Sequence, residues 1–126
     1  MKSQFAGLAA GVVLLAVSGP LFGHHNSAAR YDKEHPVTLT GTVTEFKMVN
    51  PHARLSFDVK DENGNIVKWE VESGSPSGLY RRGWRIDDLK PGDRITVTGA
   101  PAVDGSKTME LTKLVTPSGK ELLGVG

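Results

Sequence analysis

A two-residue alternation of apolar and polar side chains begins at Val37 and sets what this chain can fold into. The clearest run places Ala53, Leu55, Phe57 and Val59 on one face, with polar or charged residues between them. Successive side chains of a β-strand point to opposite faces, so this pattern predicts strands with one buried face. The alternation predicts five strands, at about residues 37–49, 52–60, 66–72, 93–99 and 107–116.

Two local signals show how these strands bend and join. In the first strand the apolar phase slips by one residue between Val43 and Phe46, which predicts a β-bulge that bends the strand. Asn63-Gly64 predicts a tight hairpin turn, because both residues tolerate a positive φ. The Gly-rich tail from residue 117 is expected to add a short pairing at an edge.

The segment from Ser73 to Leu89 interrupts the alternation. Ser75-Pro76 can begin a short helix at about residues 76–82, which Gly83 would end. Three strands, a helix and two strands are the order of a five-stranded Greek-key barrel of the oligonucleotide/oligosaccharide-binding (OB) type, an all-β fold with one short helix. The side chains expected to plug this barrel are Leu79, Tyr80, Trp84 and Leu89. A β-sandwich is the alternative.

The first 23 residues are typical of a secretory signal. Lys2 precedes an apolar run from Phe5 to Val17, and Ser18-Gly19-Pro20 then breaks any helix before Gly23. The run is shorter than the roughly 20 residues that span a bilayer, so no retained membrane anchor is expected, although an anchor is the alternative. We therefore expect a periplasmic or secreted protein with a signal peptide at 1–23, a histidine-containing segment at 24–36, linker-like from residue 26, and a barrel domain at 37–126.

Composition excludes several classes of function. Cleavage after Gly23 removes Lys2 and leaves 14 basic and 14 acidic residues, so a nucleic-acid partner is not expected. The chain has no cysteine, and therefore no disulfide, thiolate metal site or thiol nucleophile. It also lacks the sequence patterns of a serine nucleophile, a phosphate-binding loop or a zinc protease, so we do not expect an enzyme.

The histidines are the strongest candidates for chemistry. Cleavage after Gly23 would make His24 the first residue and leave its α-amine, with a pKa near about 8, free to bind a metal ion. The imidazoles of His24, His25 and His52 would add further nitrogen ligands, and an all-nitrogen set favours Cu(II). Asp32 and Glu34 could contribute a carboxylate, whereas His35 has no expected role. The alternative is that these histidines are simply solvated.

A second candidate site is the run Tyr80-Arg81-Arg82-Gly83-Trp84-Arg85. Arg81, Arg82 and Trp84 could bind a small ligand, an oligosaccharide or a partner protein, because guanidinium and aromatic groups stack on rings and pair with anions. In the alternative, the aromatic residues pack in the core and the arginines are solvated or paired, with Glu70 and Glu72 as candidate partners.

Several separated motifs carry a resemblance over essentially the whole chain after residue 23. They are His24-His25-Asn26-Ser27, Tyr31-Asp32, the strand Pro-Val-Thr-Leu-Thr-Gly-Thr-Val from Pro36, Asn50-Pro51-His52-Ala53-Arg54, the stretch from Gly74 to Trp84, and Leu89-Lys90-Pro91-Gly92-Asp93. In this order they resemble a family of small exported bacterial proteins classed as domain of unknown function 6152. The resemblance implies an exported, OB-like barrel and assigns it no activity.

Overall fold

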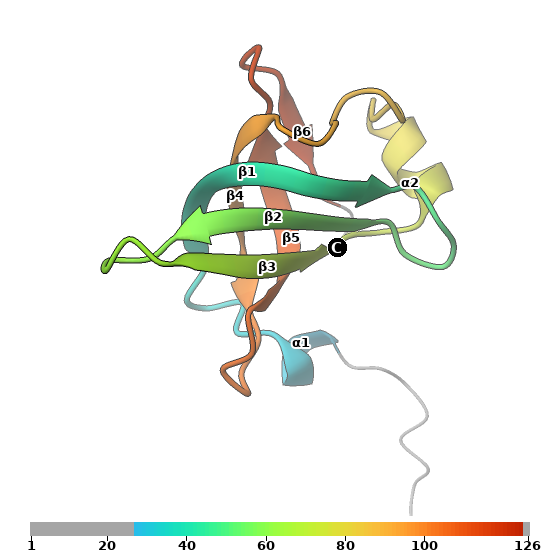
Figure 1. Cartoon of the computed structure of the whole chain (residues 1–126). Coiled ribbons are helices and arrows are strands. Elements are labelled where there is room, and N and C mark those ends of the chain that lie inside the picture. The colour runs from blue at the N-terminus through green and yellow to red at the C-terminus, as the bar shows by residue number, and fades with distance from the viewer. Residues whose placement is uncertain (1–26, 125–126) are drawn as a thin grey trace, which may run out of the picture.

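The computed structural model describes residues 27–124, which form six strands and two short helices (Figure 1). In chain order these are α1 (Ser27–Arg30), β1 (Val37–Lys47), β2 (Arg54–Lys60), β3 (Ile66–Glu72), α2 (Pro76–Arg81), β4 (Arg94–Pro101), β5 (Thr108–Val115) and β6 (Glu121–Leu123). The five predicted strands and the helix are therefore confirmed, and β6 is the expected pairing of the tail. Neither helix in this part of the chain has the length and apolarity needed to cross a membrane.

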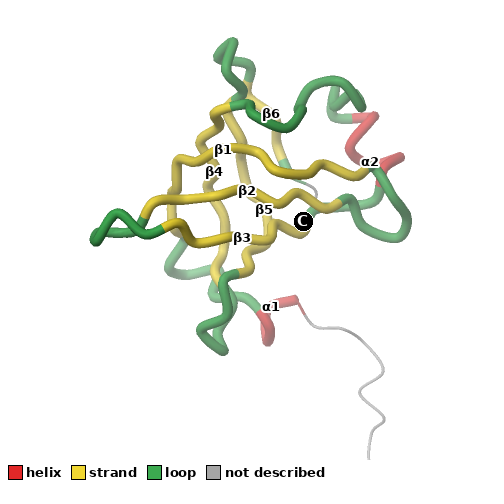
Figure 2. Tube along the Cα trace, viewed as in Figure 1, coloured by secondary structure: helices red, strands yellow, loops and turns green. Residues whose placement is uncertain are grey.

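The strands close into a barrel. They follow the order β3-β2-β1-β4-β5-β6, with antiparallel neighbours throughout. β3, the first strand in this order, also pairs in parallel with β5. This pairing places Val71 opposite Met109. Figure 2 shows both helices outside the ring of strands. The sandwich alternative is wrong, because the pairing of β3 with β5 closes the sheet on itself.

The bend in β1 is what allows closure. The first half of β1 pairs with β4 and the second half with β2, and the register with β2 shifts between Val43 and Glu45. This shift is the predicted bulge. Gly41 lies at the bend, where a Cβ atom would come within 2.3 Å of the carbonyl oxygen of Asp58. Only glycine permits this approach of β1 to β2.

A single apolar core fills the barrel, and α2 covers one end of it. Ser75 caps α2 by accepting a hydrogen bond from the backbone N–H of Gly78, as expected for a serine at this position. Leu79, Trp84 and Leu89 are buried as predicted. The prediction for Tyr80 is wrong, since 42% of it is exposed. Consecutive helical residues point about 100° apart, so Leu79 and Tyr80 cannot both face the core.

The segment before β1 packs on the barrel, although it was expected to be linker-like. Tyr31 is 3% exposed and forms an antiparallel bridge with Ala102 in the loop between β4 and β5. Asp32 donates its backbone N–H to the carbonyl of Pro101 at 2.8 Å, and Val103 donates to that of Arg30 at 3.0 Å. One buried aromatic side chain and paired backbone groups thus hold the described residues of this segment in place.

Candidate functional site

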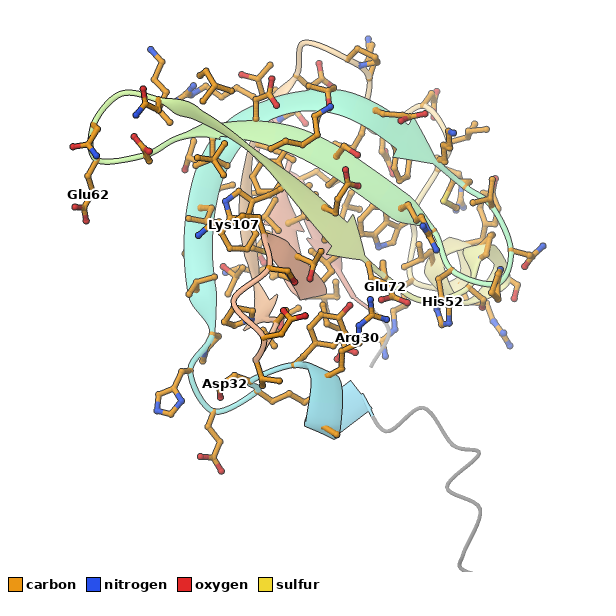
Figure 3. The ribbon with its side chains drawn as sticks, turned by 60° about the horizontal axis from the view of Figure 1, so that its bottom comes forward. Arg30, Asp32, His52, Glu62, Glu72 and Lys107 are labelled. Carbon is orange, nitrogen blue, oxygen red and sulfur yellow. The ribbon has the colours of Figure 1, made fainter. Side chains whose placement is uncertain are left out.

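A hydrogen bond between side chains fixes the N-terminal segment to the end of β3. The hydroxyl of Tyr31 donates to Oε2 of Glu72 at 2.6 Å, and Nη1 of Arg30 lies 3.6 Å from the same oxygen (Figure 3). Burial and the Glu72 carboxylate together raise the pKa of Tyr31 to about 12. At neutral pH the hydroxyl of Tyr31 therefore stays protonated and donates its hydrogen bond to the carboxylate of Glu72.

His52 lies in the turn between β1 and β2 and is held in one orientation. Its Nδ1 is 3.0 Å from the carbonyl oxygen of Ser73. A carbonyl oxygen only accepts hydrogen bonds, so Nδ1 carries the proton and the lone pair of the neutral ring is on Nε2. His52 as a whole is exposed. A backbone carbonyl that orients an imidazole in this way is the arrangement found behind metal-binding histidines.

These two features meet at the same end of β3, because Ser73 directly follows Glu72. Figure 3 shows His52 on the side of the barrel where Arg30 and Glu72 face one another. Between β3 and the N-terminal segment there is a polar hollow of about 210 Å³, lined by Arg30, Tyr31, Arg54, Glu70, Val71, Glu72 and Thr108.

The predicted copper ligands fall in two groups. His52 is described, whereas His24 and His25 lie outside the described residues. Within residues 27–124 no three side chains of the histidine, cysteine, aspartate or glutamate type are grouped so that they could hold a metal ion. A site built on His52 would therefore need ligands from outside this range.

The carboxylates considered as additional ligands are engaged elsewhere or exposed. Asp32 holds Nδ1 of His35 at 2.9 Å and also accepts the backbone N–H of Glu34. His35, which had no expected role, is therefore the partner of Asp32 in an exposed loop. Glu34 is also exposed.

The alternative ligand-binding residues do not form one surface. Trp84 is 1% exposed, and its Nε1 donates to the carbonyl of Leu123 at 2.9 Å, so its ring has no free face for stacking. Arg81 and Arg82 are exposed, and Nε of Arg81 donates to the carbonyl of Ser77. They are solvated, as the alternative allowed, and do not pair with the candidate partners Glu70 and Glu72. Glu70 accepts a hydrogen bond from Ser56, and Glu72 binds Tyr31 and Arg30.

Sequence reasoning missed the part played by Tyr31 and Glu72. Tyr31 is the single aromatic residue in a polar stretch of eleven residues, from 26 to 36, and this was the available signal for an anchored segment. The partner was not accessible from sequence, because the hydrogen bond joins residues 41 positions apart.

The closed five-stranded barrel, with a helix between its third and fourth strands, defines this protein as an OB-type barrel. The chain belongs to a family of unknown function, DUF6152, whose model matches residues 11–111. The family resemblance and the fold expected from the sequence are both confirmed. No curated protein matches the chain in sequence.

Two solved structures are similar to this barrel. The mitochondrial single-stranded DNA binding protein Rim1 from S. cerevisiae matches with a TM-score of 0.51 and 9% identity, over 66% of this chain and 93% of that chain. The yeast Stn1 and Ten1 structure matches with a TM-score of 0.43 and 14% identity, over 64% of this chain and 42% of that one. At this identity the likeness to Rim1 bears on fold alone.

Proposed function

We propose that this protein is exported to the periplasm as a binding module, not an enzyme, and that its processed N-terminus binds Cu(II) through His24, His25 and His52. Export is supported by the charge, apolar run and helix-breaking residues of the first 23 positions. Cleavage after Gly23 would free the α-amine of His24. The amine and imidazole of His24 would then chelate one ion, with further imidazoles completing a nitrogen set that favours Cu(II).

The orientation of His52 is the observation that carries this proposal. Its proton is held on Nδ1 by the carbonyl of Ser73 at 3.0 Å, which leaves the lone pair of Nε2 as the ligand atom. An imidazole already oriented loses little freedom when it binds a metal, so the affinity of the site increases.

The anchoring of Tyr31 supports the meeting of the three histidines. Arg30 and Tyr31 hold the N-terminal segment against Glu72, next to the residue that orients His52. His24 precedes the first residue of α1 by three positions, and each residue of an extended chain spans at most about 3.6 Å, so this tether has a reach of about 11 Å at most. The tether is therefore short, and it begins on the side of the barrel that carries His52.

Single-stranded nucleic acid is not part of this proposal. The outward positions of β2 and β3 hold three cationic and three anionic side chains, a serine and an isoleucine, namely Arg54, Ser56, Asp58, Lys60, Ile66, Lys68, Glu70 and Glu72. This face has no aromatic ring on which a base could stack and no excess of positive charge.

The first experiment determines the N-terminus of the exported protein by mass spectrometry. A mature chain that begins at His24 is the expected result. A chain that begins at any other residue would remove the terminal chelate and overturn the copper proposal.

The second experiment titrates the chain that begins at His24 with Cu(II), using its N-terminally acetylated form as the matched control. Acetylation removes the amine as a ligand and changes no side chain. We expect the acetylated form to bind about tenfold more weakly or worse. Equal affinities would show that the amine is not a ligand and would overturn the proposal.

A further inference from the structure

A polar groove crosses the outer face of the barrel where β1 bends. It has a volume of about 370 Å³ and is formed by four strands. Its lining residues are Thr40, Gly41, Thr42, Asp58, Lys60, Ile66 and Arg94. Figure 1 shows the bend of β1 and the hairpin between β2 and β3 on the same side of the barrel, away from α2. His52, the one histidine of the proposed copper site that the structure describes, is not among the lining residues.

Three charged side chains line this groove, Asp58 and Lys60 from β2 and Arg94 from β4. Among residues 27–124, Asp58, Lys60 and Arg94 have no side-chain hydrogen bond or ion pair. Some outward charges elsewhere do pair, as Glu45 does with Lys47 and Glu110 with Lys33, whereas Arg54 and Lys68 are unpaired and lie outside the groove. Three charged groups thus converge on one hollow with their hydrogen-bonding capacity unused.

The register of the strands fixes how these groups are spaced. Thr42 lies opposite Asp58 on β2 and opposite Arg94 on β4. Neighbouring strands are about 4.8 Å apart, so the backbones of Asp58 and Arg94 are separated by about 10 Å, with the hydroxyl of Thr42 between them. The side chains of Asp58 and Arg94 form no ion pair with each other, so both remain available to a ligand about the size of a sugar ring.

We propose that this groove binds a carboxylated sugar. The guanidinium of Arg94 can hold a carboxylate with two parallel hydrogen bonds, and Lys60 adds a second positive charge. The Asp58 carboxylate accepts hydrogen bonds from sugar hydroxyls, and Thr42 can donate or accept them. Ile66, 58% exposed at the groove, offers an apolar surface to the C–H face of the ring. Two cations and one anion favour a ligand with net negative charge over a zwitterion.

Titration of the full mature protein with sodium galacturonate, followed by NMR shifts of backbone amides, tests this proposal. Shifts are expected at residues 40–42, 58–60 and 94. Galactose, which lacks the carboxylate, and alanine, a zwitterion, should each bind about tenfold more weakly or not at all. Equal binding of galactose or alanine, shifts confined to other residues, or no shift at millimolar galacturonate would each overturn it.

Variants locate the binding in the groove. Arg94→Gln should weaken galacturonate binding about tenfold, because it removes a charged hydrogen-bonding pair. Arg54→Gln is the matched control, since Arg54 is exposed and lies outside the groove. Asp58→Asn, which keeps the shape of the side chain, should also weaken binding. An unchanged affinity in Arg94→Gln, with the fold retained in its NMR spectrum, would contradict the proposal.

Discussion

The hydroxyl of Tyr31 donates a hydrogen bond of 2.6 Å to the carboxylate of Glu72, across 41 positions of the sequence. This contact joins the segment that precedes the barrel to the end of β3. It brings the chain that leads back to His24 and His25 to the side of the barrel where His52 is oriented by Ser73. The proposed copper site depends on this hydrogen bond between Tyr31 and Glu72.

Replacing Tyr31 with phenylalanine removes the hydroxyl and keeps the ring. A hydrogen bond to a charged group contributes about 1.5–3 kcal/mol, but Glu72 keeps Arg30 and some solvent, so we expect a loss of about 1 kcal/mol. In a domain of this size the midpoint of thermal unfolding should fall by about 4–8 °C. Calorimetry measures this shift, and an unchanged midpoint would show that the contact does not hold the segment.

Alkaline pH should release the same contact. Because the pKa of Tyr31 is raised to about 12 in the folded protein from 10.0, its contribution is fully present below pH 10 and is lost as the pH rises through 12. The difference in tyrosinate absorbance between the wild type and Tyr31→Phe isolates this group. A midpoint near pH 10 in that difference would contradict the buried, hydrogen-bonded state.

Gly41→Ala should be strongly destabilising. The new Cβ would meet the carbonyl oxygen of Asp58 at 2.3 Å and a ring carbon of Phe57 at 2.8 Å, and the backbone atom cannot move without opening the barrel. We expect a loss of about 3 kcal/mol or more in denaturant unfolding. Gly64→Ala is the control: it has space around it but a φ of 80°, so it should lose about 1 kcal/mol. Equal losses would mean that β1 is not held this close to β2.

Trp84→Phe should destabilise the protein by about 2–4 kcal/mol. The smaller ring leaves a cavity in the core and the carbonyl of Leu123 without its donor. Trp69 is half-buried, with the ammonium of Lys107 5.4 Å from its ring centre, and Trp69→Phe should cost about 1 kcal/mol. If the two variants lost equal stability, Trp84 would not be the plug of the barrel.

Most of the barrel could be predicted because its signals are local. Alternation places Leu55 and Phe57 inward, and the phase slip after Val43 marks the bulge that the register confirms. The exposure of Tyr80 was missed, since alternating runs say nothing about which side of a single helical turn faces the core. Local sequence patterns therefore predict which face of a strand is buried, but they do not predict which face of a one-turn helix is buried.

The candidate sites were less predictable because they depend on contacts between distant residues. The orientation of His52 comes from Ser73, and the groove forms only where β1 pairs with both β2 and β4. Alternation does assign Asp58, Lys60 and Thr42 to the outward face, but which of them face a common hollow follows from the register. Register between distant strands is set by closure of the barrel, and no short stretch of sequence encodes it.

The Cu(II) affinity of the chain that begins at His24, compared between His52→Gln and His35→Gln, tests the central claim most directly. Both histidines are exposed, but Nδ1 of His52 binds a backbone carbonyl and that of His35 binds Asp32. If His52 completes a copper site with the processed N-terminus, His52→Gln should weaken binding about tenfold and His35→Gln should leave it unchanged. Equal affinities for the two variants would contradict the proposed site.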